Sequence, residues 1–143
     1  MVLNMDEFWE NSLPLGYYDT VLTDGVSKNR GLQANWHNST YLKISNSIND
    51  HGVHLDYACG PGSLIGNYLN SDQLYGVDIS KNQINYAKTK YGKKGNFYTN
   101  ENFKKEDYKN YFDSISAIGL MEYLTDGEIE DLLHDFYQML KPQ

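Results

Sequence analysis

The chain has 143 residues, of which 40% are hydrophobic and 22% charged, values typical of a single globular domain. Its formal net charge of -7 argues against a nucleic-acid-binding protein that depends on neutralising phosphates. No apolar run approaches the roughly 20 residues needed to cross a bilayer, the N-terminus lacks the basic start of a signal peptide, and the single cysteine fits a reducing, cytoplasmic setting.

The first 50 residues are expected to form an N-terminal helical extension. A short helical turn is predicted over residues 6–11, a break follows at residues 13–16, and residues 23–31 are rich in turn formers. A longer helix is predicted over residues 35–49, because apolar side chains recur there at a spacing of three to four. The extension is therefore expected to carry at least one complete helix before the first strand.

From residue 51 onward, short apolar runs alternate with helical patterns. Strands are predicted over residues 53–57, 73–77, 96–99 and 112–118. Helices are predicted over residues 63–69, 80–91 and 125–140. Two capping boxes, Ser80 with Gln83 and Thr125 with Glu128, indicate where the second and third of these helices begin. Because right-handed crossovers join parallel strands, this order predicts a parallel sheet in a three-layer α/β fold.

The most informative part of the chain is the first strand with the turn that follows it. The sequence VHLDYACGPGSLIG occupies residues 53–66, and LYGVDIS follows at residues 74–80. A strand, a glycine turn, a helix, a strand and an acid, in this order, are typical of a nucleotide-binding βαβ unit. Gly60 and Gly62 would let a ligand approach the backbone. Asp78, at the end of the second strand, could accept hydrogen bonds from both hydroxyls of a ribose.

Two motifs resemble those of the class I S-adenosylmethionine (SAM) dependent methyltransferases. LDYACGPGS at residues 55–63 is similar to the first motif of that family, and GVDIS at residues 76–80 is similar to the second. Gly60, Gly62 and Gly66 are spaced one residue wider than the glycines of the dinucleotide fingerprint. This spacing counts against an NAD-dependent oxidoreductase. The resemblance also includes the fourth predicted strand and the last helix.

The resemblance implies a SAM-binding site at the ends of the strands. It implies that Asp56 lies near the methionine ammonium group, Asp78 on the ribose hydroxyls and Ile79 against the adenine ring. A structural role stays open for several of these residues, such as a tight turn for the glycines or a helix cap for Asp78. The residues implied to bind the cofactor are Asp56, Ala58, Gly60, Gly62, Asp78, Ile79, Gly119 and Leu120.

Further candidates are less sharply defined. Asn100 or Glu101 could contact the adenine amino group, with a plain loop as the alternative. The resemblance makes the aromatic N-terminal extension a candidate lid, in which His37 is a candidate general base for an acceptor hydroxyl. Glu122 and Tyr123 fall where acceptor-side residues lie in relatives. Catalytic residues stay unassigned, and no histidine or cysteine pair has the spacing of a metal site.

The predicted sheet is shorter than that of the family, which usually has seven strands. The expected fold is a truncated Rossmann-like α/β/α sheet of four strands in the order 3-2-1-4, with an extension over residues 1–50 and a SAM-binding core over residues 51–143. The fourth strand would lie at an edge, and an exposed edge is a template for pairing. A second subunit in a homo-oligomer, the N-terminal extension or the remainder of a longer protein is expected to cover it.

Two functions follow from these expectations. The first is SAM-dependent methyl transfer, with S-adenosylhomocysteine (SAH) as product, to an oxygen or nitrogen of a small molecule such as a sugar or another metabolite. Neither nucleic acid nor a membrane is expected as a partner. The alternative is a non-catalytic fragment or assembly module that binds SAM or SAH and whose sheet is completed by a partner.

Overall fold

The computed structural model describes residues 7–28 and 31–142. Its strands are β1 (Val53–Tyr57), β2 (Gln73–Asp78), β3 (Asn96–Thr99) and β4 (Ser114–Ala117). Its α-helices are α2 (Tyr17–Ser27), α3 (Leu32–Ser45), α4 (Ser63–Asn67), α5 (Lys81–Tyr91) and α6 (Asp126–Met139). Three short helical turns complete the described elements: η1 (Phe8–Ser12), η2 (Lys105–Tyr108) and η3 (Met121–Tyr123). None of the described helices is both long enough and apolar enough to span a membrane.

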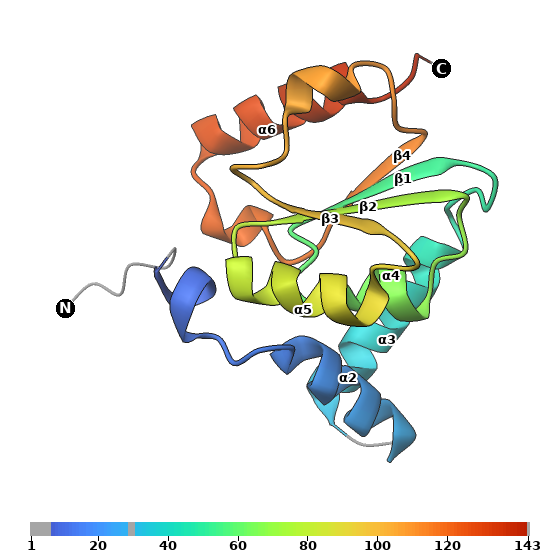
Figure 1. Cartoon of the computed structure of the whole chain (residues 1–143), viewed down its shortest axis with the longest axis vertical. Helices are drawn as coiled ribbons and strands as arrows, with labels where there is room; N and C mark the ends of the chain where they lie inside the picture. Colours follow the sequence, from blue (N-terminus) through green and yellow to red (C-terminus); the bar gives the residue numbers. More distant parts are fainter. Residues whose placement is uncertain (1–6, 29–30, 143) are drawn as a thin grey trace.

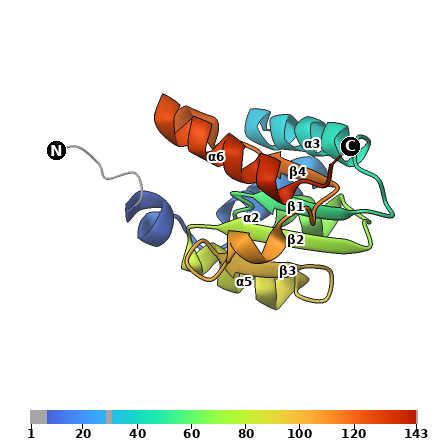
Figure 2. The same ribbon diagram turned by 90° about the horizontal axis from the view of Figure 1, so that it is seen from above.

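The four strands form one sheet in the order β3-β2-β1-β4, and every pair is parallel (Figure 2). Helix α6 covers one face of the sheet, and α2 to α5 lie on the opposite side (Figure 1). The result is a three-layer α/β/α arrangement, since each sheet face needs an apolar partner. It confirms the predicted Rossmann-like fold, the strand order and the N-terminal helical extension.

Both faces of the central strand β1 are buried. Leu55 and Tyr57 pack into the apolar cluster beneath α6, where the Tyr57 ring lies 5.2 Å from that of Phe136. His54 and Asp56 alternate with them along the strand and therefore point to the other face. Burial on both faces is what a parallel sheet requires. The two polar residues on the second face are thus placed inside the molecule.

The N-terminal extension contains more helix than the sequence predicts. Residues 23–31 are expected to be turn-rich, but α2 continues to residue 27; residues 29–30 of the predicted segment lie outside the described residues. The cause is tertiary, because Leu22 is 2% exposed and Asp19 is fully buried against the rest of the protein. Helix α3 likewise runs from residue 32 to residue 45 and not over the predicted residues 35–49.

Strand β4 lies at the edge of the described sheet. The described residues of the extension form helices joined by turns and add no strand beside it. After α6, however, the chain returns to this edge: Leu140 forms a parallel bridge with Phe112, and the Lys141 N–H donates to the Phe112 carbonyl at 2.9 Å. Of the three predicted covers, the described part of the extension is therefore not the one that pairs with β4.

Candidate functional site

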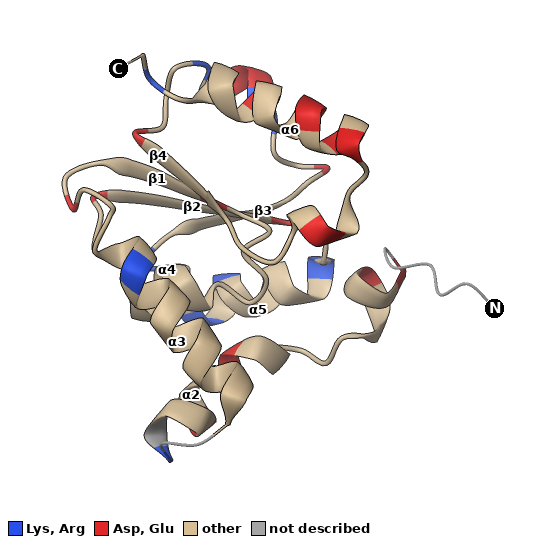
Figure 3. Ribbon diagram, turned by 180° about the vertical axis from the view of Figure 1, so that it is seen from behind, with Lys and Arg blue, Asp and Glu red and all other residues tan. Residues whose placement is uncertain are grey.

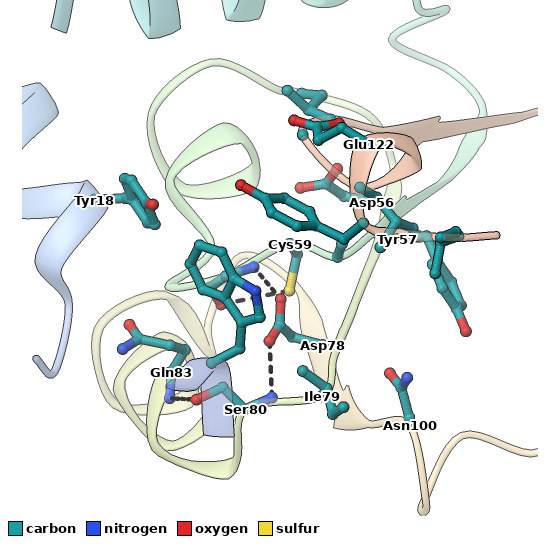
Figure 4. A pocket seen from close by; sticks show the side chains of 18 of the residues that line it. Tyr18, Asp56, Tyr57, Cys59, Asp78, Ile79, Ser80, Gln83, Asn100 and Glu122 are labelled. Carbon is teal, nitrogen blue, oxygen red and sulfur yellow. Dashed lines mark hydrogen bonds between the residues drawn. The ribbon is translucent and has the colours of Figure 1, made fainter. Parts of the chain in front are cut away.

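A cavity of about 780 Å³ opens at the carboxyl ends of β1, β2 and β4. Ligands of open α/β sheets bind at this end of the strands. The walls come from the turn after β1, the end of β2, the segment after β4, the face of α6 and the N-terminal extension. Figure 4 shows Tyr18, Asp56, Asp78 and Glu122 around this pocket. The cavity therefore joins the two sequence motifs to the extension.

The turn after β1 carries three residues in the left-handed region. Ala58 has φ 63°, Gly60 φ 52° and Gly62 φ 80°. A Cβ on Gly60 would meet no atom within 4 Å, so the space beside this cavity residue is open to a ligand. A Cβ on Gly62 would lie 2.9 Å from the Phe97 ring and 3.1 Å from Ala87. Gly62 is required by packing and does not line the cavity.

Asp78 connects the two motifs through its carboxylate. The Gly60 N–H donates to Oδ2 and the Ser80 N–H donates to Oδ1, each at 2.8 Å. Each oxygen keeps a second lone pair for a further donor. Burial raises the pKa of Asp78, while these two backbone hydrogen bonds act in the opposite direction. The carboxylate is thus held rigidly at the cavity wall with acceptor capacity remaining.

Asp56 lies at the end of a row of hydrogen-bonded polar side chains on the face of the sheet opposite α6. The Ser116 hydroxyl donates to Asp56 Oδ1 at 2.7 Å. Behind it, His54 Nε2 lies 3.0 Å from Ser116 Oγ, and His54 Nδ1 lies 2.8 Å from Ser114 Oγ. Burial raises the pKa of Asp56 to about 7, the Ser116 hydrogen bond opposes this, and nearby Asp78 adds to it. Burial lowers the pKa of His54 to about 4, so this imidazole is neutral at pH 7.

The cavity gathers most of the residues singled out from the sequence. Asn100 lines it and Glu101 does not. His37, Glu122 and Tyr123 also line it. Of the eight candidate cofactor residues, all except Gly62 are at the wall, namely Asp56, Ala58, Gly60, Asp78, Ile79, Gly119 and Leu120.

Two groups of wall residues were missed by the sequence reasoning. Trp9 comes from the extension, and its position depends on long-range packing that no local pattern encodes. Glu128, Asp131 and Asp135 come from α6. Their spacing of three and four residues puts them on one helix face, which is a signal that could have indicated an acidic wall.

Two potentially reactive side chains at the wall differ in character. Burial lowers the pKa of His37, whose Nδ1 lies 3.3 Å from the Tyr41 hydroxyl, so a neutral imidazole faces the cavity at pH 7. Burial raises the pKa of the Cys59 thiol, and nearby Asp78 and Asp56 add to the effect. A thiol held protonated is a poor nucleophile, so the buried Cys59 is suited to packing and not to covalent catalysis. No three His, Cys, Asp or Glu residues in the described ranges are grouped to hold a metal ion.

Comparison with known protein families matches residues 55–143 to a methyltransferase domain. Because this match covers more than half of the chain, the chain belongs to that methyltransferase family. Its structural neighbours are class I SAM-dependent methyltransferases, which confirms the resemblance inferred from the two sequence motifs. The comparison with curated proteins gives no match.

Among solved structures, the chain is similar to a TehB-like SAM-dependent methyltransferase from Corynebacterium glutamicum, at 18% identity and a TM-score of 0.61, over 87% of this chain and 65% of that one. It is also similar to magnesium protoporphyrin IX methyltransferase from Synechocystis with bound SAH, at 16% identity and a TM-score of 0.62, over 87% of this chain and 66% of that one. At these identities the likeness shows the fold. The chain spans about half to two thirds of the length of the solved structures it matches.

Proposed function

We propose that the cavity binds SAM and that the protein transfers the methyl group to an oxygen or nitrogen of a small-molecule acceptor. The observation that carries this proposal is the meeting of Asp56, Asp78 and the open turn at Gly60 in one cavity of about 780 Å³. These residues belong to the two motifs of a methyltransferase family. The volume lies within the range of about 300–1,000 Å³ that small-molecule sites occupy.

Each wall residue has a role that suits its position. The Asp78 oxygens accept the ribose hydroxyls with their remaining lone pairs. Ile79 packs on the adenine face, and the Asn100 amide contacts the adenine amino group. Asp56 faces the methionine ammonium group with its second oxygen, and Gly60 lets the amino-acid end approach the backbone. The proposed cofactor site is completed by Ala58 in the turn and by Gly119 and Leu120 after β4, whereas Gly62 supports the turn through its close packing against Phe97.

The reaction asks little covalent chemistry of the protein itself. SAM supplies an activated sulfonium methyl group when it is bound, so the chain's own residues bind, orient and exclude water. The acceptor would lie on the side of the cavity formed by the extension and by the segment after β4. His37, neutral at pH 7, is positioned to take a proton from an acceptor hydroxyl.

Isothermal titration calorimetry of the 143-residue protein with SAM and with SAH tests the cofactor half of the proposal. We expect micromolar binding of both, and a loss of about 1–3 kcal/mol in the Asp78→Asn variant, because a charge-assisted hydrogen bond is weakened. Asp107→Asn removes an equal charge from an exposed position away from the cavity and serves as the control. A folded protein that binds neither ligand, or that binds NADH instead, would overturn the proposal.

A second candidate function is a non-catalytic SAM- or SAH-binding module whose sheet is completed by a partner. The open edge of β4, bridged only at Phe112 and Leu140 among the described residues, favours it. Light scattering distinguishes the candidates further. A homo-oligomer supports completion of the sheet by a second subunit, whereas a monomer that binds SAM without methylating any acceptor supports the module.

A further inference from the structure

One side of the cavity is walled by aromatic rings that the cofactor motifs do not supply. The Tyr123 ring lies 5.4 Å from that of Trp9, Trp9 lies 6.4 Å from Tyr18, and Tyr18 lies 5.5 Å from the His37 ring. Trp36 continues the series at 4.9 Å from His37. All five rings line the same cavity. They form a continuous wall, which we call the aromatic wall, from the extension to the turn before α6.

The aromatic wall comes from other elements of the fold than the cofactor motifs. Asp56, Gly60 and Asp78 line the cavity at the ends of β1 and β2, whereas the rings come from η1, α2, α3 and η3. At about 780 Å³ the cavity is in the upper part of the range for small-molecule sites. The side of the cavity at the aromatic wall is therefore available to the methyl acceptor.

The charged residues that line the cavity are mostly acidic. Figure 3 shows acidic residues gathered on α6 and on the turn that precedes it. Glu122 and Asp131 line the cavity, and in the described part of the chain neither has a hydrogen-bonding or ion-pair partner. Lys105 is the one lysine or arginine among the described wall residues, and it is paired with Asp135. Burial lowers the pKa of His37, which adds no positive charge at pH 7.

We infer that the acceptor is a small amine with an aromatic or apolar body, and that it is methylated on nitrogen. The inference rests on the proposed SAM-dependent function. Aromatic faces attract cationic groups within about 6 Å of the ring centre, and carboxylates form strong hydrogen bonds with ammonium groups. An anionic acceptor would meet Glu122 and Asp131 without a free lysine or arginine to offset them.

Methylation of an amine suits this wall because positive charge develops on the acceptor. The bound ammonium group first loses one proton to water or to the neutral imidazole of His37. The lone pair of the resulting neutral nitrogen forms the N–C bond while the C–S bond breaks, and the electron pair of that bond stays on the sulfur of SAH. The nitrogen thereby becomes an ammonium group again. Preorganised rings and the carboxylates of Glu122 and Asp131 would stabilise this charge as it forms.

Two probes of similar size and opposite charge test the inference. 2-Phenylethylamine and 3-phenylpropionate are titrated calorimetrically into the protein saturated with SAH and into the protein alone. We expect the amine to bind at least about tenfold more tightly than the carboxylate. Equal or tighter binding of the carboxylate overturns the inference. The SAH titration reports separately on the cofactor site: SAH binding without amine preference refutes only the inference, whereas absence of SAH binding refutes the proposed function.

Charge variants locate the preference at the wall. Glu122→Gln and Asp131→Asn should each weaken amine binding roughly threefold to tenfold, because each removes one carboxylate from the wall. Glu130→Gln is the matched control, since it makes the same charge change on the exposed side of the same helix, outside the cavity. If Glu130→Gln weakened the amine as much as Asp131→Asn, the overall negative charge would explain the preference and the inference would be wrong.

An aromatic variant tests the rings in the same way. Trp36 is 54% exposed, so Trp36→Ala leaves the core intact while removing part of the aromatic wall. We expect it to weaken 2-phenylethylamine binding several-fold. Tyr137→Ala removes a ring that is 76% exposed on α6 and outside the cavity, and it should have no effect. Unchanged amine binding in Trp36→Ala would refute the role of the aromatic wall.

Discussion

The Ser63 hydroxyl donates to the carboxylate of Asp19 at 2.8 Å, which joins the N-terminal extension to the first residue of α4. Asp19 is fully buried, and α4 begins directly after the glycine turn of the candidate site. A buried carboxylate is tolerated only when it is paired and hydrogen-bonded. Its remaining donors are Lys90 at 2.5 Å, Tyr86 at 2.8 Å, Tyr91 at 2.9 Å and Asn67 at 3.2 Å.

Removal of this carboxylate should therefore loosen the extension. We expect Asp19→Ala to lower the free energy of unfolding by at least about 2 kcal/mol, because several buried donors lose their acceptor at once. Asp24→Ala on the same helix, which removes an exposed ion pair with Lys28, should change stability by less than about 1 kcal/mol. Urea denaturation measures both, and equal effects would contradict the special role of Asp19.

A second prediction concerns the pH dependence of stability. Burial raises the pKa of Asp56 to about 7, above the ordinary value for the unfolded chain. An acid with a raised folded pKa contributes its full stability below its ordinary pKa and loses that contribution progressively as the pH rises from there to about 7. The contribution of Asp56 to stability should thus be lost between about pH 4 and pH 7, and Asp56→Asn should reduce this loss. A variant with the same pH dependence as the parent would show that Asp56 is not the group responsible.

The ionisation of Asp56 should also change the affinity for SAM, in the opposite direction to its effect on stability. The ionised form of Asp56 attracts the methionine ammonium group, so SAM affinity should rise several-fold from pH 6 to pH 8. In Asp56→Asn the profile should be flat over this range. Calorimetry at several pH values measures both proteins, and a parent profile that is flat or falls with pH would rule out the proposed contact.

Alanine in the left-handed region provides a further prediction. Ala58 has φ 63°, a conformation that costs an L-residue with a Cβ roughly 1–2 kcal/mol. Ala58→Gly should therefore raise the free energy of unfolding by up to about 1 kcal/mol, the gain being reduced by the entropy of glycine in the unfolded chain. Ala87→Gly makes the same change inside α5 and should destabilise. Destabilisation by both variants would mean that Ala58 is not strained.

Some parts of the fold depend on local sequence and others on long-range packing. The strand ends and the glycine turn could be predicted because a βαβ unit places Gly60 and Asp78 side by side through its own geometry, and their hydrogen bond follows from it. The position at which α2 ends could not be predicted from the sequence, because its turn-forming residues become helical only when Leu22 and Asp19 are buried. The position of Trp9 beside Tyr123 depends on the same packing and has no local signal.

The start of α6 connects helix stability to the acidic side of the cavity. The Thr125 hydroxyl donates to Glu128 Oε2 at 2.7 Å, and the Thr125 N–H donates to the same oxygen at 2.8 Å, which confirms the predicted capping box. We expect Thr125→Ala to lower the free energy of unfolding by about 0.5–2 kcal/mol. Thr89→Ala, an exposed change inside α5, should be neutral or slightly stabilising because alanine is the better helix former. Urea denaturation of the two variants decides the point: if both were neutral, α6 would be held by its apolar face alone, and the capping box would not be needed to fix Glu128 at the cavity wall.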